Sequence, residues 1–164
     1  MTAPAPLDAR ATRRGVPRAG LLLGLGLVAG LDQVVFHQLL GWHTLYDLST
    51  PLASRLWEGV LHSASLVLVV GAATWGLLLS RRPGWSWRRW WAGVLVGGGA
   101  FQLFDGVVHH KVLGLHQVRY GVDLLPYDLA WDLAGVALLL AGVLLWRTGG
   151  PTARPRPTSQ ATSQ

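Results

Sequence analysis

The apolar residues of the chain fall into four long runs that are separated by short polar or charged stretches. The runs cover residues 19–40, 56–79, 90–113 and 129–146. Each run is close to the ~20 residues that an α-helix needs to cross a bilayer core. The pattern predicts an all-α integral membrane protein, a four-helix transmembrane bundle. Residues 1–18, rich in Pro, Ala and Arg, and residues 148–164 predict a disordered arm and tail.

The basic residues predict how this bundle is oriented. Eleven of the fourteen flank one end of the apolar runs: Arg10, Arg13, Arg14, Arg18, Arg81, Arg82, Arg88, Arg89, Arg147, Arg154 and Arg156. The other end has only Arg55, Lys111 and Arg119. Because basic loops stay in the cytoplasm, both termini are predicted to be cytoplasmic. We therefore expect a multi-pass protein of the inner (plasma) membrane.

The composition also indicates a membrane protein, and it excludes several kinds of chemical site. The chain is 51% hydrophobic and 13% charged, whereas soluble domains have about 25% charged residues. The net charge of +6 does not predict a nucleic-acid partner, because the arginines lie beside the apolar runs. The expected partner is the lipid bilayer. Binding to another membrane protein or to a second copy of the chain remains an alternative. The lack of cysteine excludes disulfides, thiolate metal sites and cysteine nucleophiles.

A polar motif occurs twice, with an offset of 73 residues. It reads Asp, four residues, His, five residues, His, and its copies are Asp32, His37, His43 and Asp105, His110, His116. The second helix of each half also begins alike, with Trp57-Glu58 and Trp131-Asp132. The pattern predicts two parallel two-helix repeats, related by an axis along the membrane normal. The polar residues of both copies are then expected to converge.

The position of the polar residues predicts a metal site near the extracytoplasmic face. All six histidines and seven of the eight acids lie in that half. An ionisable residue within a span costs ~2.5–3.5 kcal/mol, so these acids need compensation. Imidazole with carboxylate suits zinc, copper or iron. The candidate ligands are His37, His43, His62, His110, His116, Asp32, Glu58, Asp105 and Asp132, with His109 a secondary candidate.

Helix geometry sets one condition on that site. On an α-helix, a residue lies about 140° around the axis from the residue five positions before it. His37 and Asp32, or His110 and Asp105, can therefore share an ion only if a bulge or a bend interrupts the helix.

Four other functions stay open at this point. Histidines inside a four-helix bundle can hold haem, with His62 and either His37 or His110 as axial ligands of an electron carrier. A metal-dependent lipid hydrolase, a proton relay and a non-catalytic assembly or interaction subunit are further alternatives. The chain has no nucleophile elbow, phosphate loop or dinucleotide motif, so the sequence leaves open whether it is an enzyme.

Several motifs in order resemble a bacterial family of predicted membrane proteins, domain of unknown function 2243. The matching stretches are 32–43 (DQVVFHQLLGWH), 56–62 (LWEGVLH), 114–119 (GLHQVR) and 130–133 (AWDL), and the resemblance covers 19–147. The family typically has Phe-Asp-Gly where this chain has Leu31-Asp32-Gln33, and a further histidine where it has Thr44 and Gln117. The resemblance implies four helices and no established activity. If the further histidine completes a site in the family, the resemblance implies that the site of this chain is altered.

Overall fold

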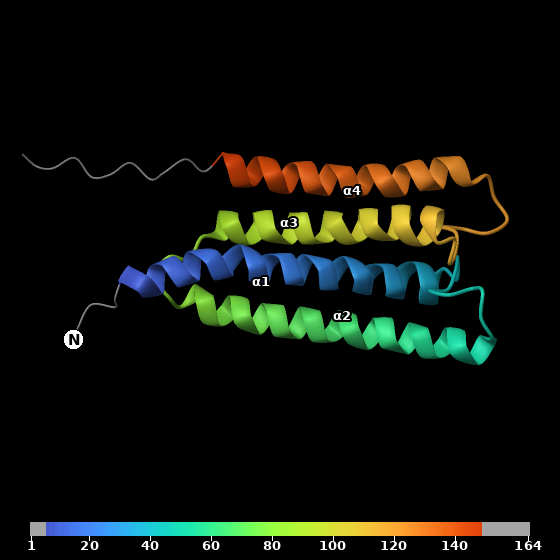
Figure 1. The fold of residues 1–164 in the computed structure, drawn as a ribbon, viewed down its shortest axis with the longest axis horizontal. Helices are drawn as coiled ribbons and strands as arrows, with labels where there is room; N and C mark the ends of the chain where they lie inside the picture. The colour runs from blue at the N-terminus through green and yellow to red at the C-terminus, as the bar shows by residue number, and fades with distance from the viewer. Residues whose placement is uncertain (1–5, 149–164) are drawn as a thin grey trace, which may run out of the picture.

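The computed structural model describes residues 6–148, and all regular elements in that range are helices (Figure 1). They are α1 (Pro6–Asp32), η1 (Gln33–Leu39), α2 (Pro51–Ser80), α3 (Trp87–Leu103), η2 (Phe104–Val112) and α4 (Leu124–Arg147), where η denotes a π-helix. Four helices are long and apolar enough to cross a membrane, with η1 and η2 continuing α1 and α3. The predicted fold class is thus confirmed. The predicted disordered tail, from residue 149 on, lies outside the described residues.

The helices α2, α3 and α4 begin where a side chain caps the first turn. Thr50, Ser86 and Asp123 each accept a hydrogen bond from a backbone N–H of the turn that follows. Such caps satisfy donors that have no partner within the helix. As a result, α2 and α4 begin at residues 51 and 124, five residues before the apolar runs from which they were predicted.

The first helix extends beyond the predicted membrane span. The residues before 19, expected to form a disordered arm, are helical from Pro6 onward. Val16 is fully buried in a cluster with Trp90, and the Arg89 guanidinium donates a hydrogen bond to the carbonyl of Arg13 at 3.2 Å. These contacts hold the extended turns of α1 against the start of α3.

The four helices pack side by side in the order α2, α1, α3, α4 (Figure 1). α1 and α3 approach closely at glycines. A Cβ atom on Gly24 would collide with the carbonyl of Val94, and one on Gly97 would collide with the carbonyl of Leu21. The two contacts are reciprocal, because residues 24 and 97, like 21 and 94, differ by the 73 positions that separate the polar motifs. This packing places the two motif-bearing helix ends next to each other.

Candidate metal site

Both motif-bearing helices change from α to π geometry at the aspartate. η1 starts directly after Asp32, and η2 starts one residue before Asp105. Each π-helix is followed by a glycine in the left-handed region, Gly41 at φ 58° and Gly114 at φ 57°. Only glycine takes this conformation without steric cost. π-helical turns are rare and occur frequently at functional sites.

An aspartate and the histidine five residues after it can share an ion only if the α-helix is interrupted, and the π-helical turns supply this interruption. The Nε2 atom of His37 lies 3.3 Å from Oδ2 of Asp32, and Nε2 of His110 lies 3.0 Å from Oδ2 of Asp105. In an α-helix these pairs would lie about 140° apart around the axis. Because both α-helices are interrupted, Asp32 and His37 face each other, and so do Asp105 and His110.

Four histidines, two from each half, come together at this point. We call His37, His43, His110 and His116 the histidine cluster. Ring centroids are 4.4 Å apart for His37 and His43 and 4.6 Å apart for His110 and His116. The rings of His43 and His116 stack, with centroids 4.7 Å apart and planes within 4°.

Two overlapping sets of side chains in the cluster could each hold a metal ion. His43, His110 and His116 form one set, and Asp32, His37 and His43 form the other. In each set the ligand atoms lie within 4.8 Å of one another.

Two backbone carbonyls orient the stacked pair. Nδ1 of His43 donates to the carbonyl of Val118 at 2.8 Å, and Nδ1 of His116 donates to the carbonyl of Leu45 at 2.9 Å. Because a carbonyl can only accept, each Nδ1 carries the proton and each Nε2 keeps its lone pair. Burial lowers the pKa of both imidazoles to about 4, so both are neutral at pH 7.

Several polar atoms of the cluster are buried without a hydrogen-bond partner. They include Nε2 of His43 and His116. Nε2 of His110 and the neighbouring Oδ2 of Asp105 also lack a hydrogen bond, but they lie 3.0 Å from each other. Native proteins leave few buried polar atoms unpaired, and each one needs an explanation. In a tetrahedral zinc site with bonds of about 2.0–2.2 Å, two ligand atoms lie about 3.3–3.6 Å apart. The 3.0 Å between Nε2 of His110 and Oδ2 of Asp105 is a few tenths of an ångström shorter than that separation.

Glu58 supports the cluster from outside. Its carboxylate lies 3.0 Å from Nδ1 of His37 and also accepts hydrogen bonds from the Gln33 amide and the Leu45 N–H. Leu45 in turn accepts from His116. Glu58 therefore orients one histidine directly and a second through the backbone. Groups that orient metal-binding histidines in this way tune metal affinity.

The remaining candidates lie in neither ligand set. Asp132 pairs with Lys111, whose Nζ lies 2.7 Å from Oδ2 of the aspartate and also donates to the carbonyl of Gly106. His62 is absent from both sets, and so is His109, which contacts Oδ1 of Asp105 at 2.9 Å. Sequence reasoning missed Lys111 as the partner of Asp132. A single lysine at the edge of an apolar span was the available signal, because such a charge needs an acid nearby.

An apolar cavity of about 440 Å³ lies beside the cluster. Phe36, Trp42, Tyr127 and Trp131 form most of its aromatic wall. The ring of Trp131 is 5.8 Å from the ring of His110. Among the described residues, no histidine lines the cavity, so Trp131 connects its wall to the histidine cluster.

Comparison with known proteins agrees with the prediction of a membrane protein. A sequence model of a family described as predicted membrane protein (DUF2243) matches residues 19–149. The chain belongs to this family. The matched range contains the histidine cluster and its supporting residues. No curated protein and no solved structure matches the chain. The family description makes the lipid bilayer the environment of the four helices and names no activity.

Proposed function

We propose that this DUF2243 member is a membrane metalloprotein that holds a transition-metal ion in the histidine cluster. His43, His110 and His116 would supply the imidazole nitrogens, and Asp105 the nearest carboxylate. The observation that carries the proposal is the reciprocal pair of hydrogen bonds that leaves Nε2 of His43 and His116 unprotonated, buried and unpaired. Neutral imidazole with an available lone pair is the form that binds a metal.

The buried carboxylates beside the histidine cluster favour the binding of a cation there. The side chains of Asp32 and Asp105 are 3% and 2% exposed. Within residues 6–148, neither forms an ion pair with a lysine or arginine. The neighbouring Lys111 is paired with Asp132 instead. Because buried carboxylates are costly without compensation, a bound divalent ion would stabilise the arrangement.

The ligand types favour zinc, copper or iron. Three imidazoles with one or more oxygen ligands and no thiolate suit these borderline metals. With the three imidazoles alone as ligands, the fourth position would be free, as is typical of catalytic zinc sites; with Asp105 bound, it would be filled. Haem fits the arrangement less well. The rings of His43 and His116 stack at 4.7 Å, and those of His110 and His116 lie 4.6 Å apart, which leaves no space for a porphyrin within the histidine cluster. These distances do not concern His62 with His37 or His110, the axial pairs considered from the sequence.

The adjacent aromatic cavity favours one second candidate, a metal-dependent lipid hydrolase. A metal ion can generate a hydroxide nucleophile from water at neutral pH. The cavity beside His110 would place an apolar substrate near that water. Turnover of lipid esters or amides by the metal-loaded protein, absent after chelation, is the test that separates a hydrolase from a metal-binding protein without this activity.

We also infer how the site lies in the membrane and how it arose. The arginine-rich ends of the helices would face the cytoplasm and the histidine cluster the opposite side, in agreement with the positive-inside rule. Reciprocal contacts at a constant offset, between Gly24 and Val94 and between Gly97 and Leu21, support a duplicated two-helix unit. The exchanged hydrogen bonds of His43 and His116 follow the same relation.

The decisive experiment is elemental analysis of protein purified in mild detergent, without a His tag or chelator, together with its visible spectrum. We expect about one metal equivalent in the wild type, loss of that metal in His116→Ala, and retention in His62→Ala, the matched control. A protein that stays empty after incubation with zinc, copper and iron would refute the proposal. A Soret band would establish haem instead.

A further inference from the structure

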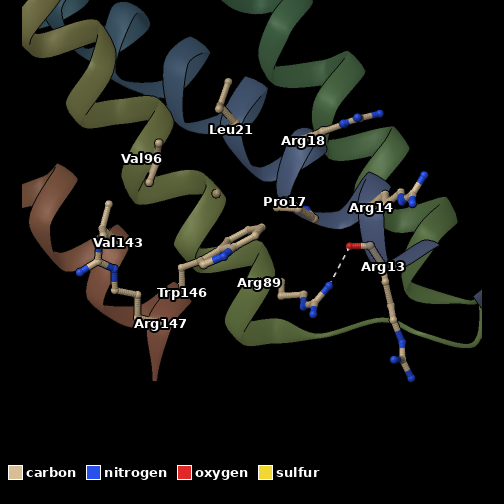
Figure 2. Close-up of a pocket in the computed structure, with 11 residues that line it drawn as sticks. Arg13, Arg14, Pro17, Arg18, Leu21, Arg89, Val96, Val143, Trp146 and Arg147 are labelled. Carbon is tan, nitrogen blue, oxygen red and sulfur yellow. Dashed lines mark hydrogen bonds between the residues drawn. The ribbon is translucent and has the colours of Figure 1, made fainter. Parts of the chain in front are cut away.

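A second site lies at the other end of the helices, where α1, α3 and α4 enclose a cavity of about 530 Å³ (Figure 2). We call it the arginine cavity, because five arginines line it: Arg13, Arg14 and Arg18 of α1, Arg89 of α3 and Arg147 of α4. No acid is among its lining residues in the described part of the chain. Asp8 of α1 lies near Arg82 instead, at 3.7 Å, and neither lines the cavity. The cavity therefore has an uncompensated positive charge.

The deeper part of the cavity is apolar. Leu21, Val96 and Val143 line it farther along the helices, whereas Arg13, Arg89 and Arg147 lie toward the helix ends (Figure 2). Most of the exposed wall consists of carbon atoms. A free anion would leave this apolar wall uncovered. A ligand with an anionic head and hydrocarbon chains would match both parts.

Arg89 is positioned to bind such a head group. One of its terminal nitrogens donates to the carbonyl of Arg13 at 3.2 Å, and its guanidinium lies 5.9 Å from the centre of the Trp146 ring (Figure 2). A guanidinium has five N–H donors. The donors that remain can bind phosphate oxygens in the bidentate manner that arginine favours.

We propose that the arginine cavity binds an anionic phospholipid, with the phosphate at Arg89, the acyl chains along Leu21, Val96 and Val143, and Arg147 adding positive charge to the cavity wall. Basic pockets between transmembrane helices are known to bind the head groups of anionic lipids. The cavity size lies within the usual range for small-molecule sites. This inference is independent of the metal proposal, because the two sites lie at opposite ends of the helices (Figure 1).

The test is native mass spectrometry of the full chain in detergent, titrated with phosphatidylglycerol, phosphatidylcholine or inorganic phosphate. We expect the wild type to bind phosphatidylglycerol and the double variant Arg89→Gln/Arg147→Gln to bind it about tenfold more weakly or worse. The matched control is Arg10→Gln/Arg81→Gln, which removes the same charge at the same end from residues that do not line the cavity. Its binding should be unchanged.

Three results would overturn the proposal. Equal weakening in both double variants would show a general attraction of the basic end for anionic lipid. Equal binding of phosphatidylcholine would show that the charge is not recognised, and competition by inorganic phosphate alone would identify a free-anion site. If Arg89→Gln/Arg147→Gln does not fold, Arg14→Gln/Arg18→Gln replaces it. These two exposed arginines make no hydrogen bond or ion pair within the described residues, and unchanged binding in that variant would also count against the site.

Discussion

Glu58 supplies the sharpest test of how the metal site is built, because it supports the histidine cluster without belonging to either ligand set. Its carboxylate contacts Nδ1 of His37 at 3.0 Å and accepts the backbone N–H of Leu45. Leu45 holds His116 through its carbonyl. The change Glu58→Gln preserves the size of the side chain and removes its charge. We expect this change to weaken metal binding because it disturbs Leu45, whose carbonyl orients the proposed ligand His116.

The expected size of the effect follows from these contacts. A hydrogen bond to a charged group contributes about 1.5–3 kcal/mol, and each ~1.4 kcal/mol changes an equilibrium constant tenfold. Loss of the charge-assisted contact that holds Leu45, and through it the proposed ligand His116, should therefore lower metal affinity about 10- to 100-fold. Changes to groups that support metal-binding histidines in known sites have effects of this size.

The assay is a competition titration with a chromophoric chelator, using the metal that elemental analysis identifies. Asp132→Asn is the matched control, because Asp132 occupies the corresponding place in the second half and pairs with Lys111 instead of a histidine. Its affinity should equal that of the wild type. Circular dichroism and thermal unfolding of each variant would show that both remain folded.

Two outcomes would refute the reasoning. Wild-type affinity in Glu58→Gln would mean that Glu58 does not orient the ligands. An equal loss in Asp132→Asn would mean that any acid near the cluster affects binding through its charge, without the specific contacts to His37 and Leu45.

Three further predictions concern the fold and its orientation. Gly24→Leu should destabilise the protein by at least about 1–3 kcal/mol in thermal or denaturant unfolding, because its Cβ would collide with the α3 backbone; Gly71→Leu, at a position open to solvent or lipid, should have little effect. Gly114→Ala should cost about 1–2 kcal/mol in the same measurement, because it forces a non-glycine residue to φ 57°; unchanged stability would contradict this. The chain has no cysteine, so in intact cells Leu48→Cys should react with a membrane-impermeant maleimide and Pro83→Cys should not; the reverse result would invert the proposed orientation.

The sequence was sufficient for the architecture and for all four members of the histidine cluster. Four long apolar runs predict four spanning helices, because no other open-chain structure satisfies its backbone hydrogen bonds in lipid. The repeated Asp-His-His spacing predicted that His37, His43, His110 and His116 would meet, and in the structure they do. This part was predictable because the spacing of polar residues within apolar segments is visible in the chain itself. The metal remains a prediction.

Other features depend on three-dimensional packing. The π-helical turns at Asp32 and Asp105 have no simple sequence signal, yet they determine which side chains share a face. Glu58 and Asp132 occupy matching positions, but Glu58 is one methylene longer and reaches a histidine, whereas Asp132 pairs with Lys111. The hydropathy of a residue indicates whether burial is favourable, but it does not identify the side chain that the residue contacts. The partner depends on helix packing and on distances of a few ångströms.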